Sequence, residues 1–216
     1  MIELEEYNTT DGRSPFADWF NDLDAQAAAK ITIALIRIEH GNFSNVKGVG
    51  AGVFEYRADF GAGYRIYFGK DGKRLVVFVG GWHKETSTAR HRSRTSPLGR
   101  LQTTQTTQGR KMTVTRSFKE TVMARIERDE EFRAALLCEG VDCLLSGDVD
   151  TGKSVLRDYI NATIGFESLS AATNTPPKSL MRMFSQKGNP QAKNLFAVIA
   201  HLQTHSGVHF EVRAVK

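Results

Sequence analysis

The hydrophobic positions of the N-terminal part of the chain change their spacing several times. Residues 2–7 alternate between apolar and polar side chains, which predicts a β-strand. Ser14 and Pro15 form a helix start, because a capping residue is followed by proline at the first helical position. Apolar residues then recur at helical spacing over 16–23 and again over 31–38. This pattern predicts an αα-hairpin with one apolar seam.

A second set of alternating segments follows the hairpin. Residues 53–60 and 64–68 each alternate, and the intervening G-A-G at 61–63 predicts a three-residue β-hairpin loop. Residues 75–79 are apolar on both faces, which is typical of a central strand. The first 94 residues are therefore expected to combine two helices with a β-sheet, which is an α+β fold.

The register of the 53–68 hairpin decides which polar side chains meet. If the loop closes in simple register, Asp59 lies opposite Arg65 and Arg57 lies opposite Tyr67. One interpretation is a solvated sheet face with a single Asp59–Arg65 pair. The other is a phosphodiester site, since guanidinium groups bind phosphate oxygens and a lysine beside arginines has a lowered pKa that suits proton transfer. The candidate catalytic residues are Arg57, Arg65, Tyr67, His83 and Lys84.

Residues 95–111 interrupt the pattern. This stretch has no acidic and no aromatic residue, and its Gln/Thr repeat offers nothing to bury. Met112 follows directly and opens a new, well-patterned segment, in the manner of a second start codon. We therefore expect two modules, residues 1–94 and 112–216, joined by a flexible linker over 95–111.

The second module is expected to be mainly helical. Its predicted elements are two amphipathic helices over 118–126 and 132–137, a helix from Gly152 to Gly165, two short helices over 167–174 and 178–186, a helix over 191–204 and a terminal strand over 209–215. The two short helices flank a tight turn, which satisfies helix-turn-helix geometry. A plain helical bundle with a polar face is the alternative.

Composition and charge narrow the class of protein. The 216 residues are 40% hydrophobic and 25% charged, as in ordinary globular proteins, and no apolar run approaches the roughly 18 residues of a membrane span. Cys138 and Cys143 are five residues apart, so we expect core residues and neither a disulfide nor a zinc site. The expectation is a cytoplasmic protein with no membrane segment, metal or cofactor. Residues 152–216 hold eight basic and three acidic residues, which favours a polyanionic partner.

The N-terminal motifs are similar to those of a known toxin family. The order strand, αα-hairpin, G-V-F-E-Y-R, G-A-G-Y-R-I-Y-F, R-L-V-V-F-V-G-G and lysine resembles the HigB-like branch of the RelE/ParE toxin superfamily. The resemblance implies an αα-hairpin packed on an antiparallel sheet, and a metal-independent mRNA interferase that acts at the ribosome. It implies that Arg65 stabilises charge on the scissile phosphate, that Arg57 holds the RNA backbone, and that Lys84 with His83 assists proton transfer. A sister branch poisons DNA gyrase instead.

The sequence departs from that family after Lys84. Such toxins usually end in a further helix, whereas residues 85–94 have no apolar period, and Trp82-His83 stands where a single small or acidic residue is expected. A frameshift that joined a toxin gene to the gene downstream is our hypothesis for this departure. A natural fusion and an engineered joining are the alternatives.

The C-terminal module resembles a second family. The motifs P-P-K-S-L-M-R-M and K-G-N-P, within residues 152–206, are similar to the HigA-like addiction-module antidotes, which carry a helix-turn-helix. The resemblance implies operator binding as a homodimer through residues 112–216, and neutralisation of the cognate toxin. The DNA-binding residues that it implies are Asn174, Thr175, Lys178, Ser179, Arg182 and Lys187.

Three functions are compatible with the paired modules. The first is a toxin–antitoxin fusion in which the antidote silences an mRNA interferase of the same chain. The second is a DNA-binding autorepressor with an inactive toxin half, and the third is a gyrase-directed toxin. Residues 112–151 hold nine acidic and five basic residues. We expect this segment, with Glu127, Glu130 and Glu131, to contact the arginine and lysine cluster of the toxin half, in cis or in trans.

Overall fold

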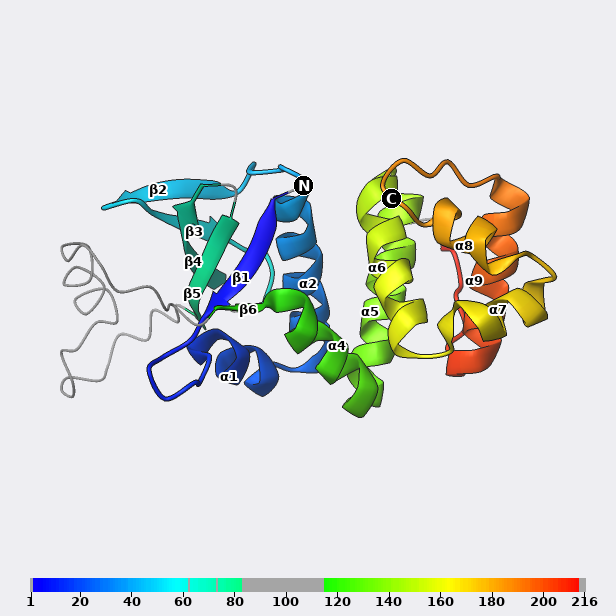
Figure 1. Cartoon of the computed structure of the whole chain (residues 1–216), viewed down its shortest axis with the longest axis horizontal. Helices are drawn as coiled ribbons and strands as arrows, with labels where there is room; N and C mark the ends of the chain where they lie inside the picture. Colours follow the sequence, from blue (N-terminus) through cyan, green and yellow to red (C-terminus); the bar gives the residue numbers. More distant parts are fainter. Residues whose placement is uncertain (1, 62, 73, 83–114, 214–216) are drawn as a thin grey trace. The chain divides into compact units, whose positions relative to one another are not determined.

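The computed structural model describes residues 2–61, 63–72, 74–82 and 115–213. Within these ranges the chain forms one six-stranded sheet and eight helices, which is the α+β class expected from the sequence (Figure 1). The predicted linker over 95–111 lies outside the described residues, as do His83 and Lys84.

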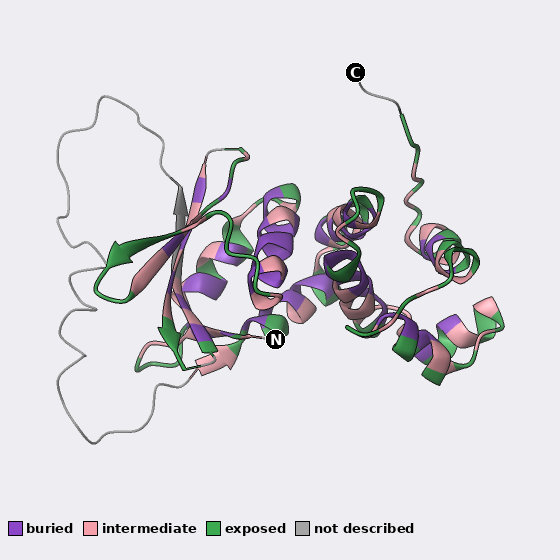
Figure 2. Cartoon of the chain, turned by 90° about the horizontal axis from the view of Figure 1, so that it is seen from above, coloured by how far each residue is buried: buried purple, intermediate pink, exposed green. Residues whose placement is uncertain are grey.

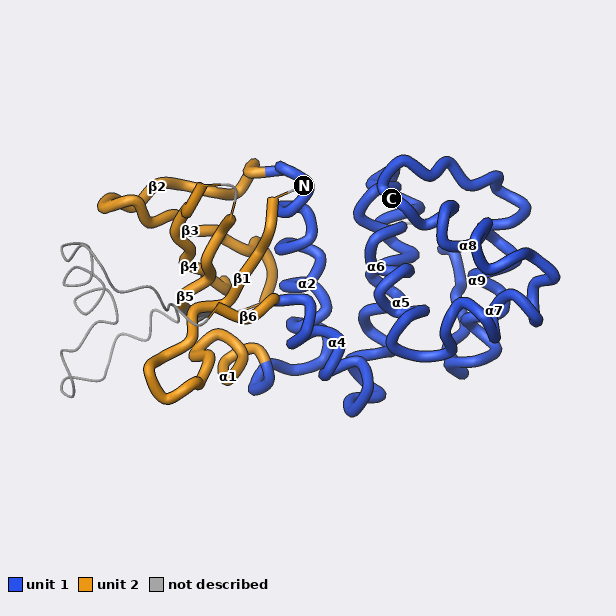
Figure 3. The backbone as a smooth tube through the Cα atoms, viewed as in Figure 1, with its two compact units in different colours: residues 1, 21–42, 118–216 blue, residues 2–20, 43–117 orange. Residues whose placement is uncertain are grey.

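Two compact units divide the chain (Figure 3). The sheet unit consists of residues 2–20 and 43–117, and the helical unit consists of residues 21–42 and 118–216. Each unit therefore combines residues from both sides of the 95–111 stretch. The second helix of the N-terminal part belongs to the helical unit.

The sheet has the strand order β2-β3-β4-β5-β1-β6. The strands are β1 (Glu3–Tyr7), β2 (Val46–Gly50), β3 (Val53–Arg57), β4 (Tyr64–Asp71), β5 (Arg74–Trp82) and β6 (Thr115–Ser117). β5 lies between β4 and β1, as its apolar character on both faces predicted. The expectation of an antiparallel sheet is correct for four of the five strand pairs and wrong for the pair of β1 with β5, which is parallel. A parallel pair needs a long crossover, and here the chain between them forms the α1, α2 and β2–β4 segments.

Among its described residues the sheet unit has one helix, α1 (Pro15–Asp22), whose last two residues lie in the helical unit. Its predicted cap is confirmed, since the Ser14 hydroxyl accepts a hydrogen bond from the Ala17 amide at 3.0 Å. Phe16 and Phe20 are fully buried, and Trp19 connects them to β4 through an edge contact of its ring with that of Tyr64 at 6.2 Å. The aromatic face of α1 is therefore part of the sheet unit's core.

The register of the β3–β4 hairpin differs from the predicted one by two residues. Arg57 lies opposite Arg65 and Glu55 lies opposite Tyr67, so Asp59 is not the cross-strand partner of Arg65. A shift of two residues keeps every side chain on its original face. Hydrophobic alternation therefore could not distinguish the two registers.

The reason for the shift is a longer turn. The Ala58 amide donates to the Tyr64 carbonyl at 2.9 Å, and beyond this bond the chain leaves the ladder. Gly61 and Gly63 both adopt positive φ, at 57° and 75°, which closes the turn over the Phe60 ring, 5.3 Å from the Tyr64 ring.

In the described part of the helical unit there are seven helices. They are α2 (Ala25–Glu39), α4 (Phe118–Arg128), α5 (Glu130–Leu145), α6 (Val149–Ala162), α7 (Gly165–Thr173), α8 (Pro177–Met183) and α9 (Ala192–Ser206). α6 begins at Val149, three residues before the predicted Gly152, with Asp148 at the N-cap position. Glycines inside α5 and α6 let these two helices pack closely. A Cβ atom on Gly152 would lie 2.7 Å from Leu144 Cγ, and one on Gly140 would lie 2.8 Å from Val155 Cγ1.

The core of the helical unit joins α5 through α9. Buried residues line the inner faces of these helices, while β2 in the sheet unit is exposed along most of its length (Figure 2). The largest buried side chains of this core are Tyr159, Phe166 and Phe184, and Leu180 and Met183 attach α8 to it. The two short helices that carry the predicted DNA-binding residues are thus fixed by their apolar faces.

Two expectations for the C-terminal module are wrong. Residues 207–213 form no strand: the Phe210 amide donates to Gln203 Oε1 at 2.8 Å, and Val212 is 81% exposed, so this segment has no neighbouring strand to pair with among the described residues. Cys138 is exposed and only Cys143 is buried, and both are free thiols. None of the helices in the described ranges combines the length and apolar character of a membrane span.

Candidate functional site

The buried carboxylate of Glu55 accepts hydrogen bonds from three of the predicted catalytic side chains. Glu55 on β3 accepts hydrogen bonds from Arg57 Nε to Oε2 at 2.5 Å, from Arg65 Nη1 to Oε1 at 2.8 Å and from the Tyr67 hydroxyl to Oε1 at 2.9 Å. All four residues project from one face, because their positions on β3 and β4 are two residues apart and the two strands pair in register. We call these four residues the Glu55 cluster.

Burial differs sharply within the Glu55 cluster. The Glu55 side chain is 3% exposed, whereas the Arg57 and Arg65 side chains are 49% and 29% exposed. Burial by itself raises the pKa of the Glu55 carboxyl, but the hydrogen bonds from Arg57, Arg65 and Tyr67 outweigh it and lower the pKa to about 2. Burial, with Glu55 as its hydrogen-bond partner, raises the pKa of Tyr67. The carboxylate is therefore ionised and the phenol is protonated at neutral pH.

Arg57 and Arg65 have more hydrogen-bond donors than Glu55 can accept from. Each guanidinium carries five N–H donors, and one carboxylate accepts about four hydrogen bonds in total. Arg57 and Arg65 can therefore bind a further anion while Glu55 holds their orientation. A phosphate is suited to this arrangement, because planar guanidinium groups match the spacing of its oxygens.

His83 and Lys84 follow the strand that neighbours this cluster. β5 pairs with β4 so that Gly81 lies opposite Arg65 and Trp82 lies opposite Tyr64. The chain therefore leaves β5 next to the arginine-bearing end of β4. The positions of His83 and Lys84 themselves lie outside the described residues.

Sequence reasoning missed the part that Glu55 plays. Glu55 and Arg57 are two residues apart in the alternating segment 53–60, so they share one face of the strand, and this was the available signal. The predicted register nevertheless gave the acidic role to Asp59, which accepts a hydrogen bond from Asn45 Nδ2 at 3.3 Å in the structure. Only the longer turn reveals that Glu55 is the acid between the arginines.

Glu55→Gln should change how stability depends on pH. The pKa of Glu55 in the fold is about 2, below its ordinary value of 4.5, so the carboxylate stabilises the fold above pH 4.5 and loses this effect as the pH falls toward 2. The full shift corresponds to about 3 kcal/mol. We expect the difference in unfolding free energy between wild type and Glu55→Gln, measured by urea denaturation, to be nearly constant above about pH 5 and to shrink from there to pH 3.

Asp71→Asn is the matched control for this measurement, since the Asp71 side chain is 72% exposed in the same sheet. Its difference from wild type should stay small throughout. A Glu55→Gln difference that is constant over the whole pH range would contradict the assigned ion pairs.

The predicted DNA-binding residues lie around α8. Asn174 ends α7 in the left-handed conformation, with φ 52°, and Thr175 donates from its hydroxyl to the Thr173 carbonyl at 3.2 Å. Pro176 and Pro177 then start α8, on which Lys178 and Arg182 are exposed and Ser179 is half-buried. The structure therefore brings five of the six predicted residues onto one short helix and the turn that leads into it.

A buried lysine fixes the loop behind α8. Lys153 on α6 donates from Nζ to the Gly188 carbonyl at 2.7 Å and pairs with Asp150 at 2.8 Å, while its side chain is only 5% exposed. Gly188 itself is packed so closely that a Cβ atom would lie 2.2 Å from the Arg182 carbonyl oxygen. Lys187, the sixth predicted residue, is exposed in this loop. Lys153 is a residue that sequence reasoning did not single out.

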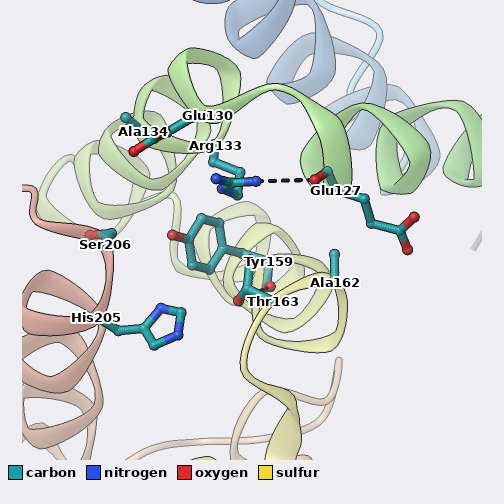
Figure 4. Close-up of a pocket in the computed structure, with 9 residues that line it drawn as sticks. All are labelled: Glu127, Glu130, Arg133, Ala134, Tyr159, Ala162, Thr163, His205 and Ser206. Carbon is teal, nitrogen blue, oxygen red and sulfur yellow. Dashed lines mark hydrogen bonds between the residues drawn. The ribbon is translucent and has the colours of Figure 1, made fainter.

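A cavity of about 330 Å³ lies elsewhere in the helical unit (Figure 4). It is lined by Glu127, Glu130, Arg133, Ala134, Tyr159, Ala162, Thr163, His205 and Ser206. Arg133 Nη1 donates to the carbonyls of Ile126 and Glu127, at 3.0 and 3.2 Å, and so caps the end of α4. The cavity holds none of the predicted catalytic or DNA-binding residues, although Glu127 and Glu130, predicted to contact the toxin half, lie in its lining. In the described ranges no group of three or more His, Cys, Asp or Glu side chains could hold a metal ion.

Comparison with known proteins gives one relative of part of the chain. An uncharacterized protein of Haemophilus influenzae is 39% identical over 72 residues, which are 33% of this chain and 73% of that protein. No family model matches the chain. No solved structure matches it either.

Proposed function

We propose that this chain, which belongs to the same family as the Haemophilus influenzae protein, is a toxin–antitoxin fusion. Residues 1–94 are the toxin half, a RelE-like, metal-independent mRNA interferase that acts at the ribosome. Residues 112–216 are the antidote half, a HigA-like protein that binds operator DNA as a homodimer and neutralises the toxin. The observation that carries this proposal is the Glu55 cluster, where the arginines and the tyrosine expected for phosphodiester chemistry converge.

The proposed reaction needs no cofactor. The ribose 2′-oxygen attacks the adjacent phosphorus and loses its proton, while the 5′-oxygen of the next nucleotide leaves and gains one. Arg65, oriented by Glu55, stabilises the negative charge that develops on the phosphate oxygens, and the more exposed Arg57 holds the RNA backbone. Lys84, with His83, assists the two proton transfers.

Operator binding is the second activity that the geometry supports. α8 presents Lys178 and Arg182 to solvent and anchors itself through Leu180 and Met183, as a recognition helix requires. Lys187 adds a charge near the end of the helix, where it can meet a phosphate. An autorepressor with an inactive toxin half is the alternative that these contacts also support.

Expression of the toxin half tests the proposal. Residues 1–117 retain β6, which pairs with β1 and covers that edge of the sheet, so this fragment is preferable to one that ends in the linker. We expect induction of residues 1–117 to stop incorporation of labelled amino acids, with new mRNA 5′ ends at codon positions, and induction of the full chain not to do so.

Other outcomes identify the alternatives. DNA cleaved with gyrase attached to it would identify a gyrase-directed toxin. Uninterrupted translation together with operator binding by the full chain would identify an autorepressor.

A further inference from the structure

Helix α2 carries a polar stripe in addition to its apolar seam. One face of the helix carries Gln26, Lys30, Ile33 and Arg37, at steps of four, three and four residues. The stripe is polar except for Ile33. Ile33 is only 3% exposed, and α2 is buried almost continuously from Ala27 to Ile36. A helix at a protein surface would leave such a stripe in water. α2 therefore has a partner on this face as well.

The partner of the stripe is the acidic part of α5 and the start of α6. Glu139 accepts a hydrogen bond from Gln26 Nε2 at 2.6 Å and pairs with Lys30 Nζ at 3.0 Å. Asp148 accepts from Arg37 Nε at 2.7 Å. The contacts thus match two basic residues of α2, seven positions apart, with two acidic residues of the C-terminal module.

Further contacts fix both ends of α2. At its C-terminal end, His40 Nε2 lies 3.2 Å from the Ser154 hydroxyl of α6. Before its N-terminal end, Arg125 of α4 donates from Nη2 to the Leu23 carbonyl at 2.7 Å, and the Arg125 side chain is 4% exposed. The stripe is therefore held along its whole length by residues from beyond the 95–111 stretch.

Because Glu139 and Asp148 are partly buried, they discriminate between basic and acidic residues on the helix that faces them. The Glu139 side chain is 14% exposed and that of Asp148 is 34% exposed. Burial alone raises the pKa of Asp148, but the hydrogen bonds from Arg37 and Thr151, together with the charge of Arg37, outweigh it and lower the pKa. A partner with acidic residues in place of Lys30 and Arg37 would leave like charges facing each other, which is strongly unfavourable in a partly buried contact.

We infer that Glu139 and Asp148 form the surface by which the antidote half recognises the toxin half, with α2 as the helix it recognises. The partner that this surface fits is a helix with basic residues seven positions apart, in this chain or in a separate toxin. The names of the two halves rest on the proposed function. Glu127, Glu130 and Glu131 were expected from the sequence to contact the arginine and lysine cluster of the toxin half. These three residues are exposed, and Arg57 and Arg65 pair with Glu55.

The test uses the full chain with a protease site inserted into 95–111. After cleavage, the two halves of the wild type should stay associated. Glu139→Lys with Asp148→Lys should raise their dissociation constant at least 100-fold, and the exchange of charges by adding Lys30→Glu and Arg37→Asp should restore most of the affinity. Glu130→Lys with Glu131→Lys, on the same helix, is the matched control and should leave affinity unchanged.

Two results would overturn the inference. One is unchanged association of the halves with Glu139 and Asp148 reversed. The other is failure of the charge exchange to restore binding, since the reversal would then have acted by unfolding the helices. Neither result bears on translation arrest by residues 1–117, because the cleavage assay measures association and not toxicity.

Discussion

Arg65→Ala should reduce mRNA cleavage by residues 1–117 by a factor of about 100 to 1000, which is the typical cost of removing one group that stabilises transition-state charge. Arg65 is the better candidate for this role because it is partly buried and bonded to Glu55. A fixed guanidinium needs little reorganisation when charge develops on the phosphate. The rate of cleavage of ribosome-bound mRNA, followed by primer extension, measures the effect.

The control for Arg65→Ala must separate catalysis from folding. Lys70→Ala removes an exposed charge from the same strand and should leave cleavage unchanged. Arg65→Lys keeps the charge but loses the planar pair of donors, so its rate should lie between those of wild type and alanine. Full cleavage by Arg65→Ala, with circular dichroism showing a folded sheet, would remove Arg65 from the mechanism.

Gly188→Ala should destabilise the helical unit by about 2–4 kcal/mol, in the range of substitutions that force a backbone rearrangement. The added Cβ atom would lie 2.2 Å from the Arg182 carbonyl oxygen and 2.4 Å from that of Met183. Both are backbone atoms at the end of α8, so neither can rotate away. Urea denaturation of the full chain measures the loss.

The same substitution should weaken DNA binding by more than tenfold. The loop at Gly188 must move, and the Lys153 hydrogen bond to its carbonyl ties that loop to α6. A displaced loop carries Lys187 and the last turn of α8 away from their places. Fluorescence anisotropy with a duplex from upstream of the coding sequence reads this out. Gly48→Ala, where an added Cβ meets nothing within 4 Å, should leave both stability and binding unchanged.

Much of the fold could be predicted because it depends on local patterns. The Ser14 cap, the α4 and α5 stripes and the central position of β5 all follow from spacing within short segments. The β3–β4 register could not be predicted, since a shift of two residues preserves the alternation on which the prediction was based. The parallel β1–β5 pair depends on contacts between distant segments, which no local pattern specifies.

The sequence predicted which arginine and tyrosine residues form the candidate site, but not how they are bonded to one another. Arg57, Arg65 and Tyr67 were identifiable from residue type and strand face, but Glu55 became their common partner only through the turn at residues 58–63. The predicted terminal strand over 209–215 failed for another reason: its pattern was identified, but the described residues of this segment do not form a strand. Its alternation is real, yet Gln203 takes the Phe210 amide, so alternation alone does not make a strand.

The position of β6 has a consequence during synthesis of the chain. The sheet is complete only when residues 115–117 have been added at the β1 edge, and the acidic partners of α2 follow at Glu139 and Asp148. At about 5–20 residues per second, a ribosome takes several seconds to extend the chain from β5 to Asp148. In every round of translation α2 is therefore made before its acidic partners Glu139 and Asp148, and the length of the chain between them sets the delay. Once the chain is released, the two halves are always present in equal number.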